Sequence, residues 1–252
     1  TTIPINLSSG REIVIIFSDL TKLKQLDITR TEFVTNISHE LRSPLANIKA
    51  MIETLVNPKI NDKEKTEEFL ALINQDIDRM TSIVNDLLEL SSIQSGHIPI
   101  HIAPFDINTV IDELISISLE KAQSLNIKIE KNIESNLPKV LGNTRMVHQV
   151  LLNILTNAFN SINKNGTIQF KTQEEDHNIA ILIQDSGKGI AKEHIPHIFE
   201  RFYKVDKSRR DQGTGLGLAI SKHIMNAING SIKVESQLGN GATFYIIIPK
   251  SH

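Results

Sequence analysis

The chain has no cysteine and no tryptophan among its 252 residues. The absence of cysteine excludes disulfides, thiolate metal sites and a cysteine nucleophile, and it makes a reducing compartment such as the cytoplasm the default expectation. No apolar run approaches the roughly 18 to 20 residues that span a bilayer. Because the chain opens with Thr1 rather than Met, we expect a piece of a longer protein, with any membrane attachment supplied by segments upstream.

The sequence also lacks an excess of positive charge. Lys and Arg number 27 and Asp and Glu 29, which gives a formal net charge of −2. There is therefore no overall basic footprint for nucleic acid, and we expect no nucleic-acid partner. Hydrophobic residues make up 40% and charged residues 22% of the chain, as in ordinary folded proteins, and two domains are expected at this length.

The N-terminal region predicts one strand followed by a helix start. The β-branched stretch from Glu12 to Phe17 is typical of a strand, and the segment from Ser18 to Thr21 can cap a new helix. One strand is not stable alone. It either closes a domain whose other strands lie upstream or pairs with the rest of this chain, and we favour the first interpretation.

Two long amphipathic helices are predicted next. Apolar residues recur at spacings of three and four from Val34 to about Asn57-Pro58, where proline stops the helix, and again from about Asp62. The seam positions are Val34, Ile37, Leu41, Leu45, Ile48, Ile52 and Leu55, then Leu70, Ile73, Ile77, Met80, Val84 and Leu87. One hairpin covers only part of each seam, so we expect a homodimer in which two hairpins form a four-helix bundle.

After Ser95-Gly96 the pattern changes to that of an α/β sandwich. Residues 97–104 are expected to be extended. The expected helices are 106–124, 144–162 and 215–227, and the expected strands are 127–133, 167–172, 178–184, 231–236 and 243–248. The predicted fold class is therefore α plus α/β, with domains at residues 1–21, 22–96 and 97–252.

His39 is the first candidate functional residue. It lies between the seam residues Ile37 and Leu41, so at about 100° per residue it points away from the seam and is exposed. Most histidines placed this way are inert. Here Glu40 follows directly and can hold or deprotonate the imidazole. Pro44 adds a proline inside the helix, at a cost of about 3 kcal/mol, which is unusual for a stretch without function.

Three further patterns lie in the second half of the chain. Asn153 and Asn157 share a helix face with Gln149, and amide oxygens suit Mg²⁺, although asparagines also occur on solvated faces. A strand leads into Asp185-Ser186-Gly187-Lys188-Gly189, which either lets the backbone approach a ligand or forms an ordinary turn. Gly213-Thr214-Gly215-Leu216-Gly217 opens a helix and can cradle phosphate. It lacks the Walker lysine and does not directly follow a strand, which disfavours both common nucleotide loops.

In this order and at these separations, the four elements resemble the H, N and two glycine boxes of HisKA-type sensor histidine kinases. The H box runs from Phe33 to Leu45, an F box from Ile198 to Lys204, and the segment from Gly239 to Phe244 matches the usual ending. The likeness covers about Leu20 to Pro249 and is strongest to PhoR-type kinases. The segment from Arg11 to Thr21 is also similar to the end of a PAS sensor domain.

The resemblance implies an ATP-dependent protein histidine kinase with Mg²⁺ as cofactor, built on a dimeric helical hairpin and an ATP-binding domain of the histidine kinase/Hsp90-like type. His39 would accept the phosphoryl group, with Glu40 as its acid–base partner, and pass it to an aspartate in the receiver domain of a response regulator. Asn157 would bind Mg²⁺, and Asp185 would bind the adenine amino group. The segment 203–212 would form a lid over the nucleotide. The implied ATP-binding residues are Asn153, Asn157, Asp185, Gly187, Gly189, Tyr203, Lys204, Gly213, Thr214, Gly215, Leu216 and Gly217.

Two departures from the family pattern matter. PhoR-type kinases usually have Lys-Tyr where this chain has Asn160-Ser161, and that tyrosine stacks on adenine. We therefore expect Ser161→Tyr to raise ATP affinity by up to about tenfold, unless another side chain fills the space. Relatives that also dephosphorylate their partner generally carry Thr or Asn four residues after the histidine, where this chain has Ser43. The resemblance leaves that activity open.

Two other classes of function compete with this interpretation. A catalytically weak pseudokinase, acting as a dimeric signalling scaffold, would keep the bundle and lose catalysis; the presence of His39, Glu40, Asn157 and Asp185 argues against it. Radiolabelled ATP discriminates, because a scaffold takes up no acid-labile phosphate. An ATPase or chaperone with the same nucleotide fold has no reason to carry an exposed His-Glu pair before a proline.

Overall fold

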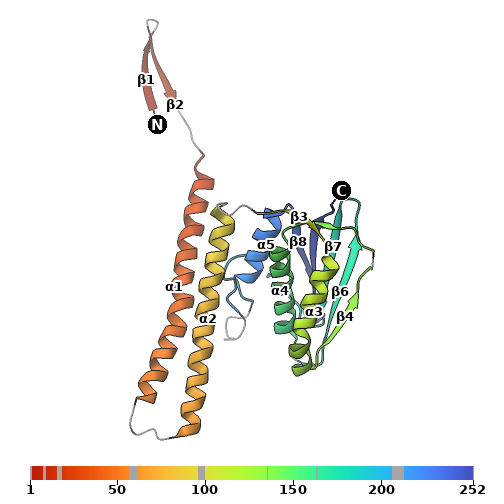
Figure 1. Ribbon diagram of the computed structural model, residues 1–252. Coiled ribbons are helices and arrows are strands. Elements are labelled where there is room, and N and C mark those ends of the chain that lie inside the picture. Colours follow the sequence, from red (N-terminus) through yellow and green to blue (C-terminus); the bar gives the residue numbers. More distant parts are fainter. Residues whose placement is uncertain are drawn as a thin grey trace. The chain divides into compact units, whose positions relative to one another are not determined.

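The computed structural model describes residues 2–7, 10–15, 19–56, 62–95, 100–134, 136–162, 164–205 and 213–251 (Figure 1). The chain divides into two compact units, Thr1–Ser43 and Pro44–His252. The unit boundary falls inside the first long helix, and each unit is described by itself. The domain boundaries expected from the sequence stay predictions.

The first unit begins with an antiparallel β-hairpin. Strand β1 (Thr2–Leu7) pairs with strand β2 (Gly10–Ile15), so that Thr2 lies opposite Ile15 and Leu7 opposite Gly10. The sequence predicted the second strand and missed the first. Strand β2 therefore has a partner within this chain, and the interpretation that this region closes a domain with further strands upstream stays a prediction. The end of the predicted strand, residues 16–17, lies outside the described residues.

Helix α1 (Thr21–Leu55) is longer than its apolar seam. Its N-terminus is capped by Asp19, whose Oδ1 accepts a hydrogen bond of 2.9 Å from the backbone N–H of Thr21. Pro44 lies inside the helix, as the sequence predicted. Because proline has no N–H, it cannot donate the backbone hydrogen bond that a helix interior normally has at this position. The expected helix end at Asn57-Pro58 lies outside the described residues.

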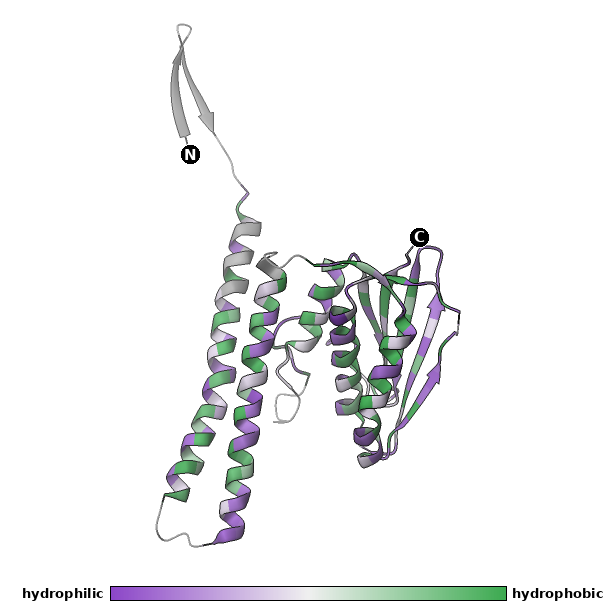
Figure 2. Cartoon of the chain, viewed as in Figure 1, coloured by the Kyte–Doolittle hydropathy of each residue, from purple (hydrophilic) through white to green (hydrophobic). Residues whose placement is uncertain are grey.

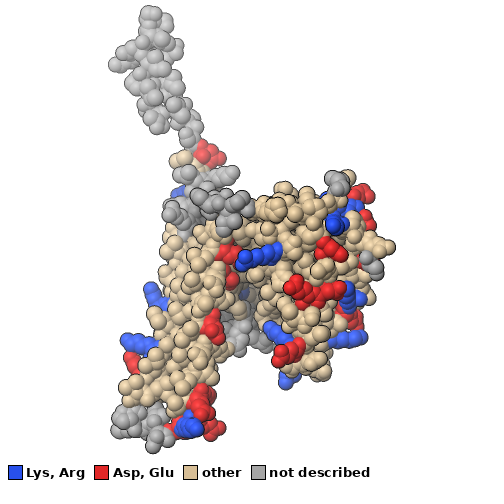
Figure 3. All heavy atoms as spheres, in the orientation of Figure 1, with Lys and Arg blue, Asp and Glu red and all other residues tan. Residues whose placement is uncertain are grey.

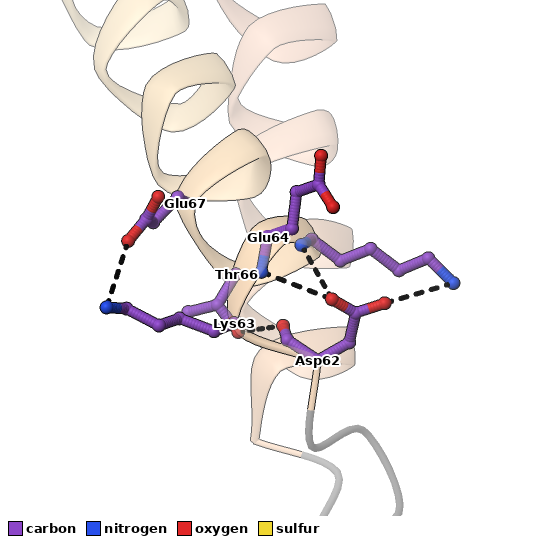
Figure 4. Close-up of polar contacts among 6 residues, drawn as sticks. Asp62, Lys63, Glu64, Thr66 and Glu67 are labelled. Carbon is purple, nitrogen blue, oxygen red and sulfur yellow. Dashed lines mark hydrogen bonds and ion pairs between the residues drawn. The ribbon is translucent and has the colours of Figure 1, made fainter.

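Helix α2 (Lys63–Ser95) starts at an aspartate cap, shown in Figure 4. Asp62 Oδ1 accepts hydrogen bonds from the backbone N–H groups of Glu64 (3.1 Å) and Lys65 (3.3 Å), and its carbonyl accepts one from Thr66 Oγ1 (2.9 Å). These contacts satisfy N–H groups that have no partner within the helix, and a carboxylate at this end also complements the helix dipole. The start expected at about Asp62 is thus confirmed.

The apolar seam of α2 is covered on one side only. Ile73 is buried, whereas Leu70, Ile77 and Val84, each seven residues from the next, are 50%, 46% and 44% exposed. Figure 2 shows apolar residues recurring along this helix between polar ones. A seven-residue repeat of exposed aliphatic side chains is the pattern of a helix that packs against a further helix. The described residues of the chain leave Leu70, Ile77 and Val84 without such a partner helix.

The rest of the second unit is a two-layer α/β sandwich. Its main sheet has five strands in the order β4-β6-β7-β9-β8, with β4 and β6 parallel and the other neighbours antiparallel. The strands are β4 (Lys128–Asn132), β6 (Thr167–Glu174), β7 (Asn178–Asp185), β8 (Ser231–Ser236) and β9 (Ala242–Pro249). The helices are α3 (Ile107–Ser124), α4 (Thr144–Ser161) and α5 (Gly217–Ala227), all on one face of the sheet (Figure 1). A separate pair of short antiparallel strands is formed by β3 (Ala103–Phe105) and β5 (Val140–Gly142).

Side-chain alternation explains why the helices cover one face of the sheet. Along β9, Ala242, Phe244, Ile246 and Ile248 are buried, and the residues between them are half-exposed. Alternate residues of a strand point to opposite faces, so one face carries the core.

Asp106 caps α3, as predicted, by accepting a hydrogen bond from the N–H of Asn108 at 2.9 Å.

The main elements predicted for this region are confirmed, within a few residues at their ends. The short strands β3 and β5 were not predicted, because three residues are too few to show a period. On the face drawn in Figure 3, acidic and basic side chains are interspersed. Within β4, Lys128 Nζ lies 2.7 Å from Glu130 Oε1. Among the described residues, none of the helices has an apolar stretch long enough to cross a membrane.

Candidate functional site

The candidate site is a pocket of about 360 Å³ in the second unit. It is lined by side chains from α4, by the turn after β7, by the glycine-rich segment before α5 and by α2. The predicted residues among its lining are Asn153, Asn157, Asp185, Gly189, Tyr203, Lys204, Gly213, Thr214, Gly215 and Gly217. Asn153 and Gly217, the first and last of these residues, are 64 positions apart in the sequence, so the fold is what brings the ten together.

Asp185, the last residue of β7, is the buried charge of the pocket. It is 3% exposed, and its Oδ1 accepts two hydrogen bonds of 2.8 Å, one from the backbone N–H of Gly187 and one from Ser161 Oγ. Burial raises the pKa of Asp185, while the hydrogen bonds from Ser161, Gly187 and the backbone of Ala242 lower it; burial is the largest effect. The carboxylate is thus held in place by donors that favour its ionised form.

Gly187 is required by space. A Cβ atom at this position would lie 2.1 Å from Ser161 Oγ and 2.7 Å from Asp185 Oδ1. Both distances are far below contact, so any side chain here would displace the two groups that form the hydrogen bond. Gly187 does not itself line the pocket; it allows Ser161 and Asp185 to meet.

Three polar residues of α4 share the face that borders the pocket, as predicted: Gln149, Asn153 and Asn157. The amide of Asn153 is fully engaged, because Nδ2 donates to Gly217 O at 3.0 Å and Oδ1 accepts from Gln149 Nε2 at 3.3 Å. This residue ties α4 to the start of α5. Within the described part of the chain, the amide of Asn157 has no hydrogen-bond partner, so its oxygen remains available to a ligand.

The glycine-rich segment packs against the F-box segment through its backbone. Gly215 has a φ of +75°, and a Cβ there would lie 2.9 Å from Phe202 Cα. Its carbonyl accepts a 2.9 Å hydrogen bond from Phe202 N. A glycine is needed both for this conformation and for this approach. Leu216 is fully buried and lies outside the pocket lining, so its side chain anchors the loop in the core, and its predicted contact with the nucleotide stays a prediction.

Tyr203 and Lys204 line the pocket from the F-box side. The hydroxyl of Tyr203 lies 2.7 Å from His194 Nδ1, which fixes the ring's outer end. Residues 206–212, the remainder of the predicted lid, lie outside the described residues.

Sequence reasoning missed two contributions to this site. Asp86 on α2 lines the pocket, and its Oδ2 accepts a 2.6 Å hydrogen bond from Thr214 Oγ1. Burial raises the pKa of Asp86, and the hydrogen bond from Thr214 lowers it by less. The sequence showed Ser161 only as the position where an aromatic ring is absent, and it did not predict the hydrogen bond from Ser161 to Asp185. Neither contact has a signal in the sequence, because the partners are 128 and 24 residues apart.

The other predicted site residues lie in the first unit. His39 is exposed on α1, as the seam geometry predicted, Glu40 is half-buried and Ser43 is exposed. These three residues lie within one and a half turns of the same helix, immediately before Pro44.

Two family models match the chain. Residues 29–96 match the His Kinase A (phospho-acceptor) domain, and residues 142–252 match the histidine kinase-, DNA gyrase B-, and HSP90-like ATPase. Among curated proteins, the chain is 32% identical over 240 residues to the sensor protein SrrB of Staphylococcus aureus, which covers 94% of this chain and 41% of SrrB.

Solved structures agree with these matches. Full-length ShkA, solved in complex with AMPPNP, is 29% identical and superimposes with a TM-score of 0.65 over 87% of this chain and 46% of ShkA. The histidine kinase ThkA, solved in complex with the response regulator protein TrrA, has the same fold, with a TM-score of 0.73 at 23% identity over 99% of this chain and 74% of ThkA.

A helical hairpin followed by an α/β ATPase domain defines the class, and the predicted fold class is confirmed. The chain belongs to the HisKA-type two-component histidine kinases. It spans about two fifths of the length of the curated relatives it matches.

We predict that Gly187→Ala weakens nucleotide binding at least tenfold, because the new methyl group would separate Ser161 from Asp185 and leave a buried carboxylate one donor short. Calorimetric titration with a non-hydrolysable ATP analogue measures this. Gly142→Ala is the matched control, since a Cβ there meets its nearest neighbour, Phe105, at an ordinary 3.4 Å. Equal affinities of the two variants would contradict the role given to Gly187.

Proposed function

We propose that this chain binds Mg-ATP in the pocket of its second unit, transfers the γ-phosphoryl group to His39, and passes it on to an aspartate of a response regulator receiver domain. The observation that carries the proposal is the pocket itself. A buried carboxylate, an amide with no hydrogen-bond partner among the described residues and glycine-rich backbone gather in an ATPase-type domain, in a chain that also has an exposed histidine followed by a glutamate.

The pocket residues suit ATP and Mg²⁺ in different ways. The Asp185 carboxylate is an acceptor that matches the amino group of adenine. The loop Gly213–Gly217 offers backbone N–H groups before α5, where phosphate oxygens are favoured. Among the described residues nothing donates to the amide oxygen of Asn157, which is a hard ligand of the kind that Mg²⁺ prefers. When bound, the ion would neutralise charge on the phosphates.

His39 and Glu40 supply the acceptor chemistry. One ring nitrogen of neutral His39 would attack the γ-phosphorus; a phosphorus–nitrogen bond forms, the bond to the β-phosphate oxygen breaks, and ADP leaves. Glu40, the next residue on the same helix, would take the proton from the other ring nitrogen. Phosphoryl transfer needs positioning and charge neutralisation more than covalent help from the protein. Exposure of His39 lets both the nucleotide and a receiver domain reach it.

Ser43 lies four residues after His39 on the same helix and is also exposed. Its hydroxyl could orient a water molecule toward a phosphorylated partner. If this chain also dephosphorylates its partner, Ser43 would act there, and slower phosphate release from a phosphorylated receiver domain with Ser43→Ala would assign it.

We predict that His39→Gln abolishes autophosphorylation and leaves ATP binding unchanged, because the acceptor and the pocket lie in different units. Glutamine keeps size and polarity at an exposed position, so folding should be unaffected. Incorporation of acid-labile phosphate from radiolabelled ATP is the measurement, and His177→Gln, another exposed histidine, is the control. Acid-labile phosphate on the His39 variant at the control's level would contradict the assignment.

The uncovered half of the α2 seam supports a homodimer. Leu70, Ile77 and Val84 form a heptad-spaced apolar stripe that the described residues of this chain leave exposed. Residues 29–96 match a phospho-acceptor domain, and two copies of such a stripe can bury one another in a four-helix bundle. We therefore propose that the second copy of this chain is what covers the stripe.

Val84→Lys should shift this chain from dimer to monomer, raising the dimer dissociation constant at least a hundredfold, because two ammonium groups would be buried at the interface without partners. The single chain should keep its fold, since Val84 is 44% exposed in it. Light scattering at micromolar concentration measures the mass. Asn85→Lys, at the next and already polar position, is the control and should remain dimeric. An unmodified chain that is monomeric yet active would contradict the proposal.

A further inference from the structure

The C-terminal end of α4 carries a hydrogen bond that the family pattern does not explain. Ser161, the last residue of α4, lines the same pocket as Asp185, the last residue of β7. Ser161 Oγ lies 2.8 Å from Asp185 Oδ1 and 2.9 Å from the carbonyl oxygen of Ala158. Both acceptors compete for one hydroxyl proton, and the carboxylate, when ionised, is the stronger acceptor.

The surroundings are built to keep this contact. Gly187 approaches so closely that a Cβ on it would lie 2.1 Å from Ser161 Oγ, and the N–H of Gly187 donates to the same Asp185 oxygen. The backbone N–H of Lys188 donates to the carbonyl of Ser161 at 3.2 Å. Side chain and backbone of Ser161 are therefore both tied to the turn that follows β7.

We infer that Ser161 is a specificity-determining residue for the nucleotide base: its hydroxyl orients the Asp185 carboxylate so that this carboxylate accepts a hydrogen bond from the 6-amino group of adenine. The inference rests on the proposed ATP site. In this chain, the hydroxyl of Ser161 would position the Asp185 acceptor at the place where PhoR-type kinases usually have a tyrosine that stacks on the base.

The physical reason is the burial of Asp185. A carboxylate that is 3% exposed has almost no contact with water. Its orientation and its ionised state therefore depend on the hydrogen bonds that the protein donates to it. Burial raises the pKa of Asp185 and the Ser161 hydrogen bond lowers it. Only the ionised carboxylate is acceptor-only, and such a group favours a base that carries an amino donor over one that lacks it.

This contact also reverses the effect expected for tyrosine at position 161. A tyrosine places its hydroxyl several bonds farther from the backbone, so it cannot reproduce the 2.8 Å contact that Ser161 makes with Asp185. The space beside it is taken by Gly187. Ser161→Tyr should therefore lose base selectivity rather than gain ATP affinity.

The test compares ADP with purine riboside 5′-diphosphate, which is ADP without the 6-amino group, by calorimetric titration. The unmodified chain should bind ADP at least tenfold more tightly, as expected for a hydrogen bond to a charged group. In Ser161→Ala the affinity for ADP should fall about tenfold while that for the analogue barely changes, so that the ratio of the two affinities collapses toward one. Ser161→Thr keeps the hydroxyl and should restore the ratio, even if its extra methyl group lowers both affinities.

Ser124→Ala is the matched control. Ser124 is the last residue of α3, and its hydroxyl bonds to the carbonyl of Lys121 at 2.9 Å. This is the same local contact as that between Ser161 and Ala158, without a carboxylate. The control should leave both affinities unchanged.

The outcomes separate the inference from the proposal beneath it. A ratio in Ser161→Ala equal to that of the unmodified chain would overturn the role of Ser161, because a merely structural effect weakens both ligands alike. An unmodified chain that binds the two nucleotides equally, or neither, would instead overturn the proposed contact between Asp185 and adenine.

Discussion

A carboxylate that is removed from water must be stabilised by donors of the protein, and in this chain that constraint falls on Asp185. The residue ends the central strand β7, where the sheet places it on the helix side of the sandwich with 3% exposure. Its Oδ1 receives two short hydrogen bonds. This requirement explains two features of the pocket. Ser161 and the backbone N–H of Gly187 both donate to Asp185, and the turn after β7 brings Gly187 close to Ser161.

Other parts of the pocket are positioned by contacts of the same kind. Asn153 joins α4 to the first residue of α5, and Gly215 lets the loop before α5 lie against Phe202. Thr214 donates to Asp86 of α2 and accepts from Leu216 N at 3.1 Å. The loop proposed to hold phosphates is therefore held at Thr214, Gly215 and Gly217, and Asn157 lines the same pocket.

The sequence predicted the elements with a clear period or a cap. The seams of α1 and α2 have spacings of three and four over many turns, and the capping residues Asp62 and Asp106 stand just before α2 and α3. The glycine-rich segments and the exposed His39 could be found because they are local runs. Their roles came from a resemblance to a family, and the roles themselves are tested by the experiments above.

What the sequence could not predict depends on contacts between distant segments. The hairpin partner β1 was missed because nothing local shows which strand pairs with which. Asp86 looked like an ordinary polar residue on a seam helix. Ser161 looked like the loss of an aromatic ring, since a sequence comparison shows which group is missing and not which new hydrogen bond replaces it. Such replacements follow from side-chain geometry, which only a structure supplies.

The central claim is that the buried Asp185 carboxylate recognises the base, and titration of its carboxyl carbon by NMR tests this most directly. Because burial dominates, the unliganded chain should show a pKa of Asp185 above the ordinary value for aspartate. Saturating ADP binds the ionised form, so by linkage it should lower this pKa, and ADP affinity should fall as the pH drops through the unliganded value. The account predicts a lower pKa with ADP than without. An identical pKa in both states would contradict it.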